Sequence, residues 1–530
     1  MALGTKGGTG GATGLFVGAL AVACSVLLVV PAAGAAAHRA PVPGLAARVP
    51  GADLGESRAR DVSFVVLLHA PLRPDCLVAH ATPAGLSVQW TAGQRWAAVD
   101  GPARAVERDF DVAVHDYRTP SGRVVYAATG PARVPGWTCG EVAGIGAIRS
   151  YTSPTREDVP ANGLTTTELV QAYDIAPLQA AGMNGQGQTV VFFESDGYRA
   201  SDLAAFAQSQ HLPAFNVQDV GQNPGQGDET PMDLETVHEI APDATLVYDD
   251  IASGRVARTG SVATVLATAL ATVGTRWPGA AVSISLGFCE TGGDFNESDV
   301  KAMNAAVATL ETTGSTVFAS SGDSGGLDCT PPNDGGKPPR SSFIGVVEPA
   351  ALPNVTGVGG TSLSTTSGGD WVGETTWSEP LLSQGAGGGV SQGFTRPKWQ
   401  TGVGTGGQLD RGHGRQVPDV AADADPATGN LILVDGHNRL GGGTSLATPI
   451  WAASTVLIDQ YLRAAGRPGV GFFNPTLYGL ANGKPPFAPF HDITTGGNDV
   501  AAATPGYDMV TGLGSPDVWH IAQDLAGGGT

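Results

Sequence analysis

The sequence is poor in positive charge. Of its 530 residues, 29 are Lys or Arg against 49 Asp or Glu, which gives a formal net charge of −20 and a pI near 4.8. Phosphates and anionic lipid headgroups repel such a chain, so the composition argues against nucleic acid or a membrane surface as a partner.

Long apolar runs are also scarce. One run, from Leu15 to Val30, follows Lys6 and leads into small residues between Ala32 and Ala37. This order is typical of a secretory signal peptide, with a membrane-retained signal anchor as the alternative. No later stretch approaches ~20 apolar residues, so no other segment is expected to span a bilayer. We therefore predict a signal peptide over residues 1–37 and a secreted, extracellular protein that leaves the membrane once it is removed.

Cysteine is rare and not spaced for a metal site. The chain has five Cys, and Cys24 lies inside the signal run. The other four (Cys76, Cys139, Cys289 and Cys329) contain no Cys-x-x-Cys pair, which argues against metal ligation. An even number in an exported chain favours disulfides, with three possible pairings. We favour Cys76–Cys139 and Cys289–Cys329, because each pair then closes within one predicted domain.

The length exceeds what one ordinary core needs, so at least two domains are expected. Residues 38–60 are rich in Ala, Pro, Arg and Gly and are typical of a linker. Short strand-like runs follow, which predict a small α+β unit up to about residue 148; they are Val62–Leu68, Val112–Val114 and Val124–Ala127. Residues 149–163 are polar, contain proline and show no periodicity, which is typical of an exposed, cleavable linker.

From Gly187 onward, strand-like and helix-like segments alternate. Such alternation predicts a parallel, doubly wound sheet with helices on its faces. The expected strands are Thr189–Phe193, Thr245–Tyr248, Ala281–Leu286 and Thr316–Ser320, and the expected helices are Ser201–Gln210, Asp233–Ile240, 261–273 and Glu297–Thr312. Residues 365–445 are expected to be mostly glycine-rich loops, with a hairpin arm at Leu431–Val434 followed by Asp435-Gly436.

The segment from Gly442 to Pro449 (GGTSLATP) carries the strongest chemical signal. It places Ser445 after a glycine-rich turn and before an apolar run that is typical of a buried helix. Backbone N–H groups and the dipole at a helix start favour developing negative charge, so this turn could present a nucleophilic hydroxyl. A simple helix cap is the structural alternative.

The histidine contexts that usually activate a serine are missing. None of the ten His residues lies in a His-Gly-Thr-type turn. Instead, the segment from Asp228 to Glu235 (DETPMDLE) opens a predicted helix with Asp228 at its N-cap, which places Glu229 and Asp233 on one face. Neighbouring carboxylates repel, so one of them keeps its proton longer than it would alone, and such a pair can act as a general base at low pH. A solvated acidic helix start is the alternative.

Asp323 is a third acidic candidate. It lies in the segment Ser320–Gly325 (SSGDSG) after a predicted strand, where ligand and catalytic groups collect in open α/β sheets. A protonated carboxyl there could donate a hydrogen bond to an oxyanion. An Asp that bonds its own turn is the alternative.

Taken together, these segments resemble the sedolisin family, the serine-carboxyl peptidases. The resemblance covers about residues 164–520. The motifs that carry it are Gly443–Pro449 (GTSLATP), Glu229-x-x-x-Asp233 followed by Ala241–Ala244 (APDA), Ser321–Gly325 (SGDSG), Gly357–Thr361 (GVGGT), and Val417–Ala421 (VPDVA) through Asp425–Gly429 (DPATG). The resemblance implies a subtilisin-like α/β fold. It also implies Ser445 as nucleophile, Glu229 as general base and acid, Asp233 as its partner, and Asp323 as oxyanion donor.

Residues 62–148 more loosely resemble the second half of the family's pro-domain, of the pro-kumamolisin type. The resemblance therefore implies a proenzyme in which residues 38–148 form a pro-domain that aids folding and inhibits the site. Acid-triggered cleavage in the linker 149–163 would release a peptidase spanning 164–530, a monomer acting on protein or peptide substrates. Leu286 stands where several family members have Trp, so the shape of the substrate pocket is not predicted.

The C-terminal segment resembles the family's calcium site. The implied ligands of Ca²⁺ are the carboxylates of Asp492 and Asp508 and the backbone carbonyls of Ile493, Thr504 and Gly506. An all-oxygen set from loops suits this hard cation. Glycine- and proline-rich turns with solvated Asp residues are the alternative.

Two other functions are kept as alternatives. One is a subtilisin-type peptidase with a Ser-His-Asp triad. The other is a catalytically inactive, secreted binding module that calcium stabilises.

Overall fold

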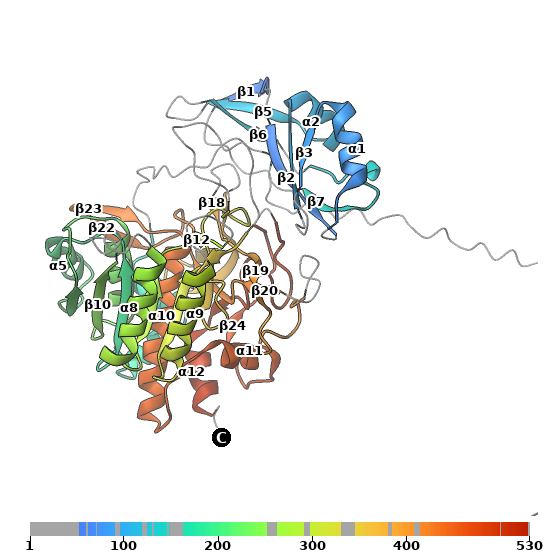
Figure 1. The fold of residues 1–530 in the computed structure, drawn as a ribbon. Coiled ribbons are helices and arrows are strands. Elements are labelled where there is room, and N and C mark those ends of the chain that lie inside the picture. The colour runs from blue at the N-terminus through green and yellow to red at the C-terminus, as the bar shows by residue number, and fades with distance from the viewer. Residues whose placement is uncertain are drawn as a thin grey trace, which may run out of the picture. The chain divides into compact units, whose positions relative to one another are not determined.

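The computed structural model describes residues 52–59, 62–69, 72–90, 96–118, 124–129, 132–145, 148, 163–251, 262–290, 297–329, 345–379, 384–406, 414–498 and 500–527. We call residues 52–148 the N-terminal part and residues 163–527 the C-terminal part (Figure 1). The predicted signal peptide, residues 38–51 and nearly all of the predicted linker lie outside the described residues. Within the described ranges, no helix has the length and apolar character that crossing a membrane requires.

The N-terminal part is a small α+β unit of two antiparallel sheets, as predicted. One sheet has the order β3 (Ser87–Gln89), β4 (Trp96–Gly101), β2 (Val62–Leu68), β7 (Val142–Ile145). The other has the order β1 (Ala52–Glu56), β5 (Val114–Arg118), β6 (Val124–Ala128). Helices α1 (Asp75–Ala84) and α2 (Ala103–Phe110) and the 3₁₀ helix η1 (Gly136–Thr138) complete it. The strand predicted at Val112–Val114 was misplaced, because α2 ends in a left-handed turn at Asp111 and pairing starts at Val114.

Side chains that alternate along β2 build the core of this part. Val62, Phe64 and Val66 are fully buried, as expected for a strand with one face turned to the core. They pack on the apolar face of α2, where Phe110 meets Phe64 edge to face at a ring-centroid distance of 4.8 Å.

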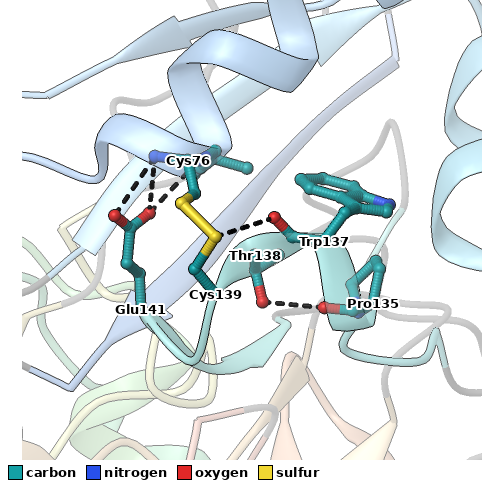
Figure 2. Close-up of a disulfide and its surroundings, with 7 residues drawn as sticks. Cys76, Pro135, Trp137, Thr138, Cys139 and Glu141 are labelled. Atoms are coloured by element: carbon teal, nitrogen blue, oxygen red, sulfur yellow. Dashed lines mark hydrogen bonds between the residues drawn. A yellow bond between two sulfur atoms is a disulfide. The ribbon is translucent and has the colours of Figure 1, made fainter.

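A disulfide fastens α1 to the segment that precedes β7. Figure 2 shows Cys76 bonded to Cys139, beside a Glu141 carboxylate that accepts hydrogen bonds from the Cys76 and Leu77 backbone N–H groups. Glu141 thus caps the start of α1, where the helix dipole favours negative charge. The second disulfide joins Cys289 and Cys329 in the C-terminal part, so both predicted pairings are confirmed.

A large sheet forms the centre of the C-terminal part. Its strand order is β16-β15-β13-β11-β8-β10-β9, with β21 also paired to β15; all pairs are parallel except β15 with β16. The strands are β8 (Thr189–Glu194), β9 (Val217–Val220), β10 (Thr245–Asp250), β11 (Ala281–Ile284), β13 (Thr316–Ser320), β15 (Thr356–Thr365), β16 (Trp371–Thr376) and β21 (Val420–Asp423). The predicted parallel α/β fold is confirmed.

Helices cover both faces of this sheet, which is why its central strands are continuously apolar. Along β8, Val191 and Phe193 face a cluster with α8 (Val262–Arg276) and α9 (Glu297–Glu311), which lie side by side in Figure 1. Val190 and Phe192 face the opposite cluster, which contains α6 (Glu229–Ile240) and α10 (Thr444–Ala464). The other helices are α3 (Thr166–Ala172), α4 (Ala176–Ala180), α5 (Ala200–Ser209), α11 (Asn474–Asn482) and α12 (Val518–Ala526).

Residues 365–445, which the sequence predicts to be mostly loops, contain several strands. Besides β16 and β21, the C-terminal part has five two-stranded pairs: β12 (Phe288–Cys289) with β14 (Val347–Glu348), β17 (Ser378–Glu379) with β18 (Gln384–Gly385), β19 (Gly389–Thr395) with β20 (Gly414–Val417), β22 (Leu431–Val434) with β23 (His437–Leu440), and β24 (Phe490–His491) with β25 (Ser515–Pro516). The predicted hairpin is confirmed: Asp435 and Gly436 have φ of 55° and 74°, as a tight turn between β22 and β23 requires.

Candidate active site

Three neighbouring strands deliver polar side chains to one edge of the sheet. β8 ends at Glu194, β11 is followed by Ser285, and β13 is followed by the turn that contains Asp323. Because β13, β11 and β8 are adjacent and parallel, their carboxyl ends lie together, where open α/β sheets hold their ligands. This edge receives the starts of α6 and α10.

Ser445 is the second residue of α10 and is partly exposed, whereas Thr444 and Leu446 beside it are buried. The turn before it needs glycine, because Gly443 has a φ of 85° and a Cβ there would lie 2.7 Å from an Asp323 carboxylate oxygen. The chain therefore presents one hydroxyl at a helix start, as the sequence indicates.

The buried Glu229 carboxyl interacts with the Ser445 side chain, which favours the charged form of Glu229. Glu229 is the first residue of α6, and its pKa is raised well above the usual range by burial and by the nearby Asp233. Among the described residues, no histidine hydrogen-bonds to Ser445. On the same helix, the His238 ring is stacked on Phe215 and lies 2.8 Å from the Pro213 carbonyl.

Behind Glu229, Asp233 is fully buried one helical turn along α6. It accepts a 2.7 Å hydrogen bond from the Ser285 hydroxyl, which also lies 3.3 Å from the Ser445 carbonyl oxygen. The buried carboxyl of Glu194 also interacts with Asp233, and each affects the pKa of the other. Burial raises the pKa of Asp233 to about 7 and that of Glu194 well above its usual range. Neighbouring buried carboxyls cannot all ionise together, so Glu229, Asp233 and Glu194 take up and release their protons as a group.

On the other side of the nucleophile turn, Asp323 faces Thr444. One Asp323 carboxylate oxygen accepts hydrogen bonds from the Thr444 backbone N–H at 2.7 Å and from its hydroxyl at 2.9 Å. Burial raises the pKa of Asp323, although the two bonds from Thr444 lower it. A carboxyl of this kind is neutral in acid and can then donate a hydrogen bond.

The start of α6 is capped by a residue that the sequence did not indicate. Asp228 occupies the N-cap position, as expected, but makes no side-chain capping bond. Instead, the Asp196 carboxylate accepts hydrogen bonds from the N–H groups of Asp228, Glu229 and Thr230, at 2.8, 3.1 and 3.0 Å. Asp196 therefore fixes the turn that carries Glu229.

The structure thus brings the four predicted catalytic residues to one sheet edge and adds three that sequence reasoning missed. Glu194, Asp196 and Ser285 follow or end predicted strands at the carboxyl edge, so their positions were a usable signal. Their roles depend on contacts with residues 32–52 positions away in the chain, which a single sequence does not show.

The predicted calcium ligands lie in one loop cluster. The Asp492 carboxylate accepts a 2.9 Å bond from the Gly506 N–H, and the Asp508 carboxylate accepts one of 3.1 Å from the Thr504 N–H. Ile493, next to Asp492, is buried. Burial raises the pKa of Asp508 to about 7, and within the described ranges no Lys, Arg or His pairs with either Asp. The donor set, two carboxylates and peptide oxygens, fits a hard divalent cation.

Comparison with known proteins decides the family. The chain is 32% identical over 464 residues to kumamolisin from Bacillus sp. (strain MN-32), covering 81% of this chain and 78% of kumamolisin. It is 30% identical over 491 residues to sedolisin from Pseudomonas sp. (strain 101), covering 86% and 79%. The chain belongs to the sedolisin family. It is thus a serine-type peptidase.

A solved structure agrees with this family. Pseudomonas sedolisin, a serine-carboxyl proteinase complexed with pseudo-iodotyrostatin, superposes on this sedolisin-family chain with a TM-score of 0.56 and 27% identity, covering 70% of this chain and all of the other. No family model matches the chain. A tripeptidyl-peptidase of Arthroderma otae, SED2, is 31% identical over 271 residues, 46% of this chain.

Proposed function

We propose that the chain is a secreted, acid-active serine-carboxyl peptidase that is made as a self-processing proenzyme. The observation that carries this proposal is the group of buried carboxyls beside Ser445: Ser285 links Asp233 to the Ser445 backbone, and Glu229 and Glu194 interact with the same group. An imidazole would be fully protonated in acid, whereas neighbouring carboxyls share their protons, so that one of them can be left ionised to accept the serine proton.

In the proposed reaction, Ser445 attacks the carbonyl carbon of a peptide bond while Glu229 takes its hydroxyl proton. Glu229 then returns this proton to the leaving amine, and an ester links Ser445 to the acyl half of the substrate. Water attacks this ester in the second half-reaction, with Glu229 again as base. The negative charge of the base is shared between Glu229 and Asp233 throughout the reaction. Glu194 interacts with Asp233 and so helps to hold this charge.

Asp323 would stabilise the intermediate. Its protonated carboxyl lies beside the nucleophile turn and would donate a hydrogen bond to the oxyanion, a kind of contact worth about 10²–10³-fold in kcat. Once Asp323 ionises, it loses this proton and its negative charge repels the oxyanion. The alkaline limb of the pH profile should therefore follow Asp323.

We also propose that Ca²⁺ binds between Asp492 and Asp508. The two carboxylates and the backbone carbonyls of Ile493, Thr504 and Gly506 would hold it. The cation would order this loop cluster by neutralising carboxylates that have no cationic partner among the described residues, and it would take no part in the reaction.

In the proenzyme, residues 38–148 would act as an intramolecular inhibitor and folding aid, and the mature peptidase would be a monomer of about residues 164–530. The deciding experiment is the mass of the chain after incubation at pH 4, for the wild type and for Ser445→Ala. The wild type should shorten to the mature form and digest casein, while the variant should stay intact. Self-processing by the variant would exclude Ser445 as the nucleophile.

A further inference from the structure

The far half of α6 carries two more carboxyls, Glu235 and Glu239, which the proposed reaction does not use. Both are essentially fully buried, at 0% and 1% exposure. They lie on the same helix as Glu229 and Asp233. A segment that is hydrogen-bonded to Glu235 and Glu239 is therefore held at a fixed position relative to the proposed base, Glu229.

Both carboxyls bind the start of the hairpin β22–β23. The Leu433 backbone N–H donates to Glu235 at 2.7 Å, and the Asn430 side-chain amide donates to Glu239 at 3.0 Å. Glu239 also accepts a 2.9 Å bond from the Thr166 hydroxyl. Two residues earlier, Leu164 forms a backbone bridge beside Asn430.

The same hairpin leads directly into the nucleophile turn. β23 ends at Leu440, and Gly441–Gly443 connect it to α10 and Ser445. The Gly441 N–H donates to the Asn430 carbonyl at 2.8 Å, so the base of the hairpin also fixes the first residue of the turn. A Cβ at Gly441 would lie 3.2 Å from the sulfur of Met232, which shows how closely the turn passes α6.

The charges around these carboxyls are of one sign. The groups that act on Glu235 are Glu239 and Asp202 of α5, both acidic, and the bonds to Glu239 come from neutral side chains. Burial raises the pKa of Glu235 to about 9 and that of Glu239 to about 8. In acid, both therefore stay neutral and can remain buried as hydrogen-bonding partners of the hairpin.

We propose that Glu235 and Glu239 are positioning residues, which fasten the hairpin β22–β23 to α6 and so hold the Ser445 turn at a fixed distance from Glu229. This inference rests on the proposed function, because it assumes that Ser445 and Glu229 react together. Displacement of a reacting group by about 1 Å can lower the rate by about 10²-fold, so this tether acts on the chemical step.

The test compares Glu239→Ala and Glu239→Gln with the wild type at pH 4, by kcat and KM on a peptide substrate per mole of folded, mature enzyme. Glu239→Ala should lower kcat about 10-fold or more and change KM less than about 2-fold. Glu239→Gln should restore kcat to within about 3-fold, because its amide oxygen can accept from Asn430.

Two further variants keep the test decisive. Thr166→Val removes one donor to Glu239 and should lower kcat about 2- to 3-fold, even if Glu239→Ala does not fold. The matched control is Glu311→Gln, a partly buried carboxyl on α9 that contacts neither the hairpin nor the site, which should leave kcat unchanged.

Wild-type kcat in both folded Glu239→Ala and Thr166→Val would overturn the inference, as would a loss that appears in KM alone. Ser445→Ala separates this result from a failure of the proposed function. If Ser445→Ala is inactive while the Glu239 variants are fully active, the tether alone is wrong. If Ser445→Ala still turns over, the proposed function is wrong.

Discussion

The two parts of the chain treat their carboxyl groups in opposite ways. In the N-terminal part, Asp109 is paired with Arg108 at 2.7 Å, and Asp53 with His115 at 2.9 Å. Hydrogen bonds from these side chains lower the pKa of both carboxyls. In the C-terminal part, Glu194, Glu235 and Glu239 are buried among neutral or acidic groups, and burial raises their pKa.

Because of this difference, the carboxyls named in the two parts make opposite contributions to the pH dependence of stability. A carboxyl with a lowered pKa stabilises the fold above its unfolded pKa, and this contribution is lost as the pH falls through the folded value. A carboxyl with a raised pKa does the reverse: its folded form is favoured at low pH, and stability is lost as the pH rises from the unfolded value towards the folded one. Acid therefore removes the contribution of Asp53 and Asp109 in the N-terminal part, whereas burial of Glu194, Glu235 and Glu239 costs least in acid.

One buried ion pair in the C-terminal part departs from this pattern. Arg415 and Asp419 are both fully buried and form a salt bridge, joined by hydrogen bonds from Asn474 and Tyr478 to Asp419. The pair sits beside β20 and β21, away from the carboxyl cluster at Ser445. Among the described residues, no Lys or Arg forms such a pair with Glu229, Asp233, Glu194 or Asp323, as expected where carboxyls must exchange protons; Arg439 pairs only with the neighbouring Asp228.

The largest effect should come from removing the proposed base. Glu229→Gln keeps the size of the side chain but cannot take a proton, so kcat of the mature enzyme at pH 4 should fall about 10²–10⁴-fold. Glu311→Gln, on α9 of the mature enzyme, is the matched control and should leave kcat within about 2-fold. Hydrolysis of a chromogenic peptide measures both, and comparable kcat for Glu229→Gln and the wild type would reject the carboxylate base.

The next effect concerns Asp323 and the alkaline limb of the pH profile. Asp323→Ala removes the proposed donor and should lower kcat about 10²–10³-fold. Asp323→Asn keeps a neutral N–H donor at every pH, so it should retain part of the activity and lose the decline that follows ionisation of Asp323. A pH profile of kcat for the two variants checks this. An alkaline limb in Asp323→Asn that matches the wild type would assign that limb to another group.

The dependence of stability on pH can be measured on the Ser445→Ala precursor, which is expected to stay uncleaved. Between pH 5 and pH 8, each of Glu235 and Glu239 that stays protonated in the folded state should cost the C-terminal part about 1.4 kcal/mol per pH unit. The thermal midpoint of this part should therefore fall as the pH rises. Glu235→Gln should flatten the slope, and a slope that Glu235→Gln leaves unchanged would place the titrating group elsewhere.

Much of the fold was predictable because its signals are local. Apolar runs that end in turn residues identified β8, β10, β11 and β13, and Asp435-Gly436 identified the hairpin. The sequence did not predict the strands β16 and β21. β21 is short and buried, and the residues of β15 with which it pairs lie 62 positions earlier in the chain. The β5 prediction failed at its start, where a left-handed Asp111 delays pairing.

The residues of the candidate site also differ in whether a local sequence signal identifies them. Ser445, Glu229, Asp233 and Asp323 lie in short motifs with recognisable neighbours. Glu194 and Asp196 lie in an ordinary strand end, Phe192–Asp196 (FFESD), where an acidic residue has many possible roles. Their importance comes from tertiary contacts with α6, and only the fold brings these segments together.

The smallest expected effect concerns the calcium loop, where an external cation would do what arginine and histidine do in the N-terminal part. Saturating Ca²⁺ at about 100 times its Kd should stabilise the mature enzyme by about 2.7 kcal/mol, which raises the midpoint of a unit this large by about 3–4 °C. EDTA should reverse this shift in the wild type and have no effect on Asp508→Asn. Glu311→Gln, outside the loop, should respond to EDTA as the wild type does. A thermal midpoint that does not change with Ca²⁺ would mean that Asp508 is buried as a neutral carboxyl, like Glu235 and Glu239. The calcium loop would then follow the same pattern as the rest of the C-terminal part.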